Sequence, residues 1–208
     1  MRICNRYPKF SMNNIGSHFF KLFWQEQNVA IIFFRRWGCM FCRLWAKELG
    51  EIAPILKKNN IRLVGIGVEN TGSREFIDGK FFDGDLYYVE DLSTYQTLGF
   101  KRFNLVTIIT SLFWKQSREA IYKGKSLGLK SDIVGDGLQG GGAILLQNGV
   151  KPIHFVQMAP ADRLLNTDII EVLCYCILYL EDVYYLINKR YFFGENSVDK
   201  YSILSPNM

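Results

Sequence analysis

The sequence lacks the segments that mark secreted and membrane-spanning proteins. Residues 1–18 contain no continuous apolar stretch like that of a secretory signal peptide, and no Asn-x-Ser or Asn-x-Thr sequence occurs in the 208 residues. The apolar run at residues 172–180 covers nine residues, whereas a membrane-spanning helix needs about 20. We therefore expect a cytoplasmic protein, whose cysteines stay reduced unless they take part in chemistry.

Cysteine and histidine are also scarce. Five cysteines, an odd number in a chain of this length, do not form the disulfide framework of a small secreted domain. Cys39 and Cys42 have the spacing of zinc ligands, but a structural zinc site usually needs a second close pair. Cys174 and Cys176 lie about 200° apart around a predicted helix and cannot both face one metal ion. His154 lies in a predicted strand, where we expect it to pack or hydrogen-bond. The sequence therefore predicts no metal site.

Charge is present but not concentrated enough to indicate nucleic-acid binding. Lys and Arg number 25 against 20 Asp and Glu, a net charge of +5, and no helix-turn-helix, zinc-finger or RNA-binding signature is visible. Apolar residues make up 49% and charged residues 22%, as in ordinary globular proteins. We expect an N-terminal segment at residues 1–18, one domain at 19–180 and a C-terminal extension at 181–208. We expect the extension to dock on the core or a partner subunit, or to make a peripheral membrane contact.

The most informative feature that is present is the C-x-x-C sequence of Cys39 and Cys42. It follows the apolar run of residues 29–34, which predicts a buried strand, and it opens a helical pattern over residues 39–59 that Pro54 should kink or interrupt. A cysteine at a helix N-terminus has a lowered pKa, because unpaired N–H groups and the helix dipole stabilise its thiolate. Cys39 is therefore the expected nucleophile and Cys42 the resolving thiol. Two structural cysteines remain the alternative.

The remaining patterns predict alternating strands and helices. A hairpin signal joins residues 143–147 and 153–157 through Asn148-Gly149, and Asn166 to Asp168 begin a helix after it. The other predicted elements are strands at 61–67 and 86–89 and helices at 18–27, 73–78, 92–98 and 117–127. A strand–helix–strand start with a closing hairpin predicts an α/β fold, a thioredoxin-like three-layer arrangement with a mixed central sheet.

One glycine-rich segment matches a nucleotide-binding pattern only in its letters. Residues 135–140, GDGLQG, fit G-x-G-x-x-G, but the dinucleotide fingerprint must follow a strand and open a helix. Here the segment precedes a predicted strand. We therefore interpret it as a flexible loop and expect no Rossmann-type nicotinamide site.

The segment FRRWGCMFCR at residues 34–43 resembles the active-site segment of the peroxiredoxin-like 2 family. Further stretches resemble the branch of that family that reduces prostaglandin endoperoxides, and the similarity spans roughly residues 20 to 174. These further stretches are IRLVGIG at 61–67, YQTLGFKRF at 95–103, the glycine-rich segment 135–142, and HFVQ at 154–157 with Pro160 and Asp162.

The resemblance implies a thioredoxin-like oxidoreductase that reduces the endoperoxide of prostaglandin H2, and of its ethanolamide, to the F-type diol. Cys39 would attack one peroxide oxygen and Cys42 would displace it, leaving a disulfide. Arg36 or Arg43 would stabilise the developing alkoxide, or would instead pair with Asp or Glu. NADPH is the implied ultimate electron donor.

Two departures and two alternatives accompany that resemblance. Thioredoxin-like enzymes usually place a proline opposite the C-x-x-C pair, whereas this chain has QGGG at residues 139–142, which predicts a more open substrate wall. Without a nucleotide fingerprint, NADPH is expected to act through a separate thioredoxin-type reductase. The alternatives are a general peroxidase or regulator of protein thiols, and a non-enzymatic binding module.

Overall fold

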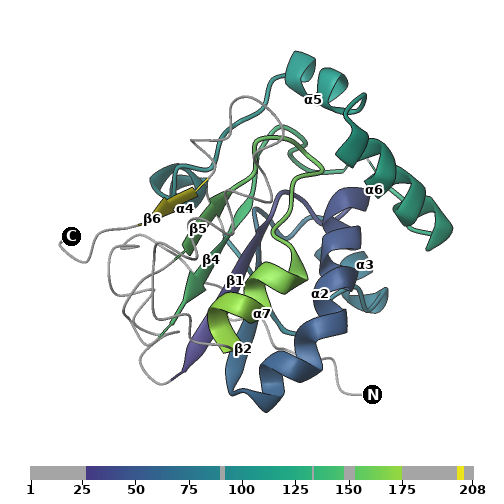
Figure 1. Cartoon of the computed structure of the whole chain (residues 1–208). Helices are drawn as coiled ribbons and strands as arrows, with labels where there is room; N and C mark the ends of the chain where they lie inside the picture. Colours follow the sequence, from purple (N-terminus) through teal and green to yellow (C-terminus); the bar gives the residue numbers. More distant parts are fainter. Residues whose placement is uncertain (1–26, 90–91, 133, 148–152, 175–200, 204–208) are drawn as a thin grey trace.

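The computed structural model describes residues 27–89, 92–132, 134–147, 153–174 and 201–203. In this part of the chain, one sheet has the strand order β3-β2-β1-β4-β5-β6 (Figure 1). The strands are β1 (Asn28–Phe34), β2 (Ile61–Gly67), β3 (Asp85–Tyr88), β4 (Gly142–Leu146), β5 (Ile153–Val156) and β6 (Tyr201–Ile203). β1, β2 and β3 pair in parallel, whereas β4 pairs antiparallel with both β1 and β5, so the sheet is mixed.

β1 lies at the centre of this sheet and is buried on both faces. Ile31 is opposite Val64 of β2 and Ile144 of β4. Alternate side chains of β1 enter two separate apolar clusters, with Phe34 in one and Phe33 in the other. A strand covered on both faces is expected to be continuously apolar, as the sequence of β1 is.

Helices complete the layers on the two faces of the sheet. The helices are α2 (Met40–Lys58), α3 (Ser73–Asp78), α4 (Ser93–Thr97), α5 (Leu105–Ser111), α6 (Lys115–Ser126) and α7 (Asn166–Cys174). α2 and α7 cover the face of Phe34, where Trp45 and Leu49 join the cluster, and Tyr95 of α4 packs on the face of Phe33. The predicted α/β, thioredoxin-like architecture with a mixed central sheet is confirmed.

The predicted elements agree closely with the observed ones, except at a few places. β3 begins and ends one residue earlier than predicted, and α6 begins two residues earlier. α2 continues through Pro54 without interruption, contrary to one of the two expected effects of this proline. The carbonyl group of Gly50 loses its helical hydrogen bond to residue 54; Gly50 is partly exposed and residue 54 is exposed, so water can solvate this carbonyl. The predicted helix at 18–27 and the Asn148-Gly149 turn lie outside the described residues, residue 27 excepted.

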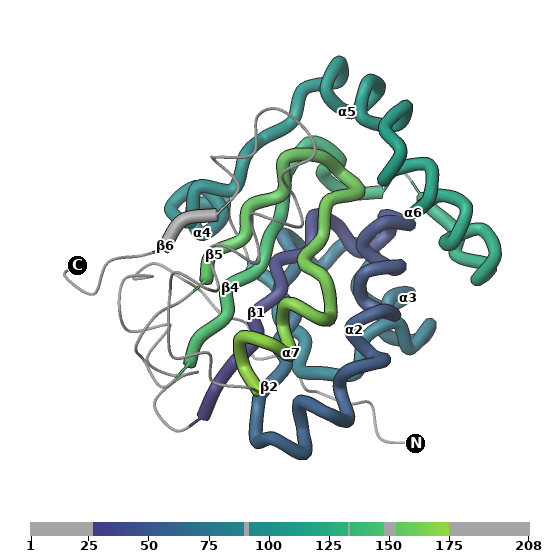
Figure 2. Tube along the Cα trace, in the orientation of Figure 1, coloured from purple at the N-terminus to yellow at the C-terminus, as the bar shows by residue number. Residues whose placement is uncertain are grey.

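The sequence analysis missed two elements, β6 and α5, and the seven-residue α5 is the longer of them. Its sequence, LVTIITS, is rich in β-branched residues, which favour strands over helices. The side chain of Asn104 accepts a hydrogen bond from the Thr107 N–H at 2.7 Å and so caps the helix. Asn104 was therefore the local signal that a helix begins here. Figure 2 shows α5 and α6 following one another along the margin of the molecule, outside α2.

The outer boundaries of the predicted domain fall on residues that the structure does not describe. The segment 1–18 and most of the extension 181–208 belong to this part, so the boundaries at 19 and 180 stay predictions. None of the helices among the described residues is long and apolar enough to cross a membrane.

Candidate active site

The thiol pair lies where β1 passes into α2. Cys39 is the N-cap residue of α2, with an extended backbone (φ −76°, ψ 125°), and its carbonyl accepts the first helical bond from Arg43 N at 2.9 Å. Cys42 lies one turn further along, inside the helix. The side chains of both residues are almost fully buried. The expected position of Cys39 at a helix N-terminus is confirmed, whereas the catalytic roles of both cysteines stay predictions.

The two sulfur atoms have opposite electrostatic character. The pKa of Cys39 is well below its ordinary value. The main cause is a hydrogen bond that the Cys42 thiol donates to Cys39. The charges of Arg35 and Arg36 and the backbone N–H of Cys42 lower the pKa further, whereas burial opposes the shift. The same hydrogen bond and burial raise the pKa of Cys42 well above its ordinary value. Cys39 therefore ionises more readily than Cys42, which favours Cys39 as the nucleophile.

Arg35 is the charged residue in direct contact with the Cys39 sulfur. It is 4% exposed, and its Nη1 donates to Cys39 Sγ at 3.5 Å. Its Nε and Nη2 donate to the carbonyl groups of Gln139 at 3.1 Å and Gly137 at 2.6 Å. The sequence analysis gave Arg35 no role, because the spacing of two adjacent arginines does not say which of them turns toward the sulfur.

The two arginines chosen from the sequence have different positions. Arg36 lines a pocket beside Cys39 and donates to the Val134 carbonyl at 3.4 Å, and its Nε has no hydrogen-bond partner within the described part of the chain. Arg43 is buried and ion-paired with Asp132 at 3.2 Å and Glu75 at 3.1 Å. Arg43 is not among the residues that line the pocket. Its position matches the second expectation, that it pairs with Asp or Glu.

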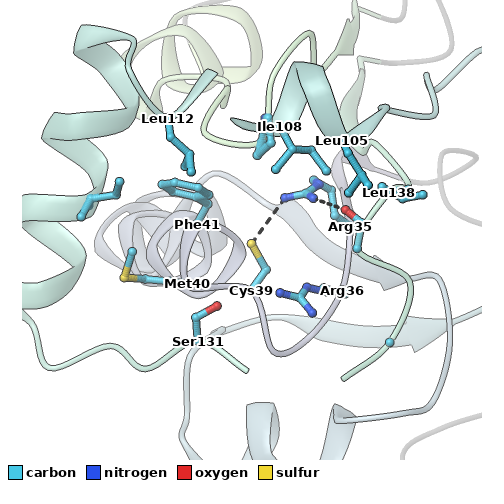
Figure 3. Close-up of a pocket in the computed structure, with 14 residues that line it drawn as sticks. Arg35, Arg36, Cys39, Met40, Phe41, Leu105, Ile108, Leu112, Ser131 and Leu138 are labelled. Atoms are coloured by element: carbon cyan, nitrogen blue, oxygen red, sulfur yellow. Dashed lines mark hydrogen bonds between the residues drawn. The ribbon is translucent and has the colours of Figure 1, made fainter. Parts of the chain in front are cut away.

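A pocket of about 570 Å³ opens in front of Cys39, within the range of small-molecule sites (Figure 3). Cys39 lies on its wall, whereas Cys42 is not part of the lining. The apolar lining comes from α2, α5, α6 and two loops: Met40, Phe41, Leu105, Ile108, Leu112, Ile121, Leu138 and Pro160. The pocket can hold an apolar molecule with one polar group near the Cys39 sulfur and the two arginines.

The glycines that replace the usual proline allow close packing of backbone on backbone. A Cβ atom on Gly141 would lie 2.1 Å from the Phe33 carbonyl oxygen, and one on Gly142 would lie 2.1 Å from that of Phe155. Only glycine fits these positions without a shift of the backbone.

The stretch that contains Gln157 and Asp162 fixes the adjacent loop. Gln157 accepts from Gly141 N at 2.8 Å, and the Asp162 carboxylate accepts from the N–H groups of Met158 and Ala159. This network holds Pro160 on the pocket wall. It gives a physical reason for the presence of HFVQ, Pro160 and Asp162 among the family-like stretches.

The glycine-rich loop at 135–140 does not fit a dinucleotide. It leads into β4 rather than into a helix, and it turns two carbonyl groups toward Arg35 instead of presenting N–H groups to a phosphate. Among the described residues, no three His, Cys, Asp or Glu side chains are grouped as metal ligands.

The fold and the position of the C-x-x-C pair place the protein among the thioredoxin-like proteins. The chain belongs to the AhpC/TSA antioxidant enzyme family, whose model matches residues 48–159, more than half of its length. The match begins after Cys39 and Cys42, so it does not test their roles.

Similar proteins of known name share most of their length with this chain. Relatives from Danio rerio, Xenopus tropicalis and Homo sapiens, each named prostamide/prostaglandin F synthase, are 42%, 37% and 38% identical to it. The aligned regions cover 67%, 74% and 72% of this chain and 71%, 77% and 77% of the relatives. The predicted resemblance is thereby confirmed.

Proposed function

We propose that this protein reduces the endoperoxide of prostaglandin H2, and of its ethanolamide prostamide H2, to the corresponding F-type diol. The observation that carries the proposal is the position of Cys39, a sulfur with a lowered pKa on the wall of a largely apolar pocket of about 570 Å³. Relatives at 37–42% identity bear the name prostamide/prostaglandin F synthase. A lipid with a weak O–O bond matches both the lining and the nucleophile.

The proposed reaction uses the two sulfur atoms in sequence. The Cys39 thiolate attacks one peroxide oxygen, so an S–O bond forms, the O–O bond breaks, and the second oxygen leaves as an alkoxide that takes up a proton. The Cys42 sulfur then attacks Cys39, so an S–S bond forms, the S–O bond breaks, and the first oxygen leaves and is protonated. The Cys42 thiol, whose pKa is raised, supplies one of the two protons. The products are one diol and one disulfide.

The arginines have separate roles in this proposal. Arg35 contacts the Cys39 sulfur and stabilises the attacking thiolate. Arg36 lines the pocket and stabilises the departing alkoxide, because a fixed positive charge in a site of low dielectric constant favours developing negative charge. Arg43 positions the loop through its ion pairs and takes no part in the chemistry.

The disulfide must be reduced before a second turnover. We propose that the two electrons come from NADPH through a separate thioredoxin and thioredoxin reductase, which exchange thiols with the Cys39–Cys42 disulfide. The loop at 135–140 does not fit a dinucleotide, which supports an indirect route. Such a cycle requires a compartment with reduced dithiol donors, as the cytoplasm provides.

The test is turnover of prostaglandin H2 with a dithiol reductant, with the diol measured by mass spectrometry. We expect Cys39→Ser to lower the rate by about a thousandfold or more, because it removes the nucleophile. When the dithiol is omitted, because it would itself release the adduct, Cys42→Ser should stop after forming one equivalent of a covalent adduct at Cys39. Cys174→Ser is the matched control, since Cys174 is absent from the pocket lining, and it should keep full activity.

Three results would contradict the proposal. Full activity in Cys39→Ser would exclude the thiol mechanism. A kcat/KM for hydrogen peroxide well above that for the endoperoxide would instead support the general peroxidase. If neither substrate is turned over, the binding-module alternative gains support.

A further inference from the structure

α5 and the corner after it present large apolar side chains to solvent. Val106 is 69% exposed, Ile109 58%, Phe113 76% and Trp114 48%. We name these four residues the α5 patch; α5 itself lies at the outer margin of the molecule (Figure 1). Soluble proteins rarely expose neighbouring apolar side chains of this size unless they form an interaction surface.

The segment that carries the α5 patch is strongly basic. Residues 101–130 contain seven Lys or Arg and one Glu, a net charge of +6, whereas the whole chain carries +5. All seven basic residues are exposed. Lys101, Arg118, Lys125 and Lys130 form no ion pair within the described ranges, so their charges are available to a partner. The charge distribution therefore favours a negatively charged partner.

The same helix also forms one side of the pocket. Leu105, Ile108 and Leu112 line the pocket, while Val106 and Ile109 point to solvent from neighbouring positions. Figure 3 shows the three lining residues gathered above Cys39 and Arg35. A partner surface that binds the α5 patch would therefore lie next to the pocket.

We propose that the α5 patch docks this protein onto the surface of a phospholipid membrane that contains anionic lipids. Val106, Ile109 and Phe113 enter the boundary between headgroups and acyl chains, Trp114 lies at headgroup level, and the surrounding Lys and Arg attract the anionic headgroups. Exposed Trp and Phe flanked by Lys and Arg are typical of segments that lie in this interface. Binding itself is independent of catalysis. That it brings the pocket to a lipid substrate rests on the proposed function.

The test is co-sedimentation of the full chain with vesicles of phosphatidylcholine, with and without phosphatidylserine, in the absence of substrate. We expect binding to the vesicles with phosphatidylserine and loss of it in about 1 M salt, where the Debye length is about 3 Å.

Phe113→Ser with Trp114→Ser should weaken binding by about tenfold or more. Serine is the better N-cap of α6 at position 114, so this variant should fold. Arg118→Glu with Lys125→Glu should weaken binding by a similar factor.

Matched controls lie elsewhere on the molecule. Ile55→Ser alters an apolar side chain of α2 that is 43% exposed, and Lys57→Glu with Lys58→Glu makes the same change in net charge at the last turn of α2. Both should change binding by less than about twofold. The Phe113/Trp114 variant should reduce a small soluble peroxide as fast as the unchanged protein, because neither residue lines the pocket.

Several results would overturn the inference. Among them are absence of vesicle binding, equal binding of all variants, and self-association of the chain that the Phe113/Trp114 variant abolishes. The last would assign the α5 patch to a second copy. If vesicle binding follows the prediction while the endoperoxide is not turned over, the docking surface stands and the proposed function fails.

Discussion

At the scale of residues, the character of Cys39 depends more on Cys42 than on any arginine. The hydrogen bond from the Cys42 thiol is the largest influence on the pKa of Cys39, and the charge of Arg35 is smaller than both this bond and the opposing effect of burial. The partner thiol therefore has a role before the disulfide forms. It stabilises the thiolate of Cys39, the proposed nucleophile, in the reduced protein.

Removal of this hydrogen bond should raise the pKa of Cys39. In the unchanged protein, the rate of alkylation by iodoacetamide should rise with pH around a midpoint below the value of about 8.5 for a free cysteine. Cys42→Ala should move the midpoint to higher pH, because the thiolate loses a donor, and Arg35→Met should move it by less. Cys42→Ser keeps a donor and should restore part of the shift. An unchanged midpoint in Cys42→Ala would contradict this account. The measurement is peptide mass spectrometry of Cys39.

The sequence predicted the cysteines better than the arginines. Cys39 could be placed at a helix N-terminus because a buried strand precedes it and a helical pattern follows it. The arrangement of Arg35, Arg36 and Arg43 depends on residues about 90 to 100 positions away, Gly137, Val134 and Asp132. Local spacing contains no information about such distant partners.

At the scale of elements, the start of β4 is constrained by its neighbours rather than by its own propensity. The Cβ positions of Gly141 and Gly142 are filled by carbonyl oxygens of β1 and β5, so these strands approach closely beside the pocket. Gly50 of α2 is the opposite case, since nothing lies within 4 Å of its Cβ position.

Two Gly→Ala substitutions should therefore change stability in opposite directions. Gly142→Ala should lower the free energy of unfolding by about 1–3 kcal/mol, because backbone atoms must move to admit the methyl group. Gly50→Ala should raise it by about 0.5–1 kcal/mol, because alanine is the better helix former. Urea denaturation followed by circular dichroism measures both. Equal effects of the two substitutions would show that the contacts at Gly142 are not rigid.

β1 to β5 were predictable because each of them is a short apolar run between turn residues, whereas β6 was not predicted. α5 was not predicted, since its β-branched residues favour a strand over the helix that the Asn104 side chain caps. Its exposed apolar face also lacks the pattern of a helix buried on one side.

At the scale of the whole molecule, the proposed reaction needs an external reductant for the disulfide. The described residues hold one dithiol pair behind a pocket and a glycine loop that binds Arg35. The order of strands and helices was enough to predict the layers around this site, because strand–helix–strand units have few allowed connections. Neither the order nor the layers identify the reductant.

NADPH alone should therefore not sustain turnover. We expect the reduced protein with NADPH to form about one equivalent of diol and stop, because the proposed mechanism makes one disulfide per product. Addition of thioredoxin and thioredoxin reductase should restore continuous oxidation of NADPH, followed at 340 nm, in proportion to the diol formed. Omission of the thioredoxin is the control. Continuous turnover with NADPH alone would show that the nucleotide acts directly on this chain.

The contacts around Cys39 also bear on the reduction potential of the pair. Arg35, Arg36 and the Cys42 thiol stabilise the thiolate, which exists only in the reduced protein. Any stabilisation of the reduced form makes the disulfide a stronger oxidant, by about 30 mV for each pKa unit by which the thiolate is favoured. A chain that is easily reduced in this way is returned to its reactive state by modest concentrations of dithiol. In the proposed mechanism, the groups that stabilise the Cys39 thiolate thus also favour the flow of electrons from the reductant into the disulfide.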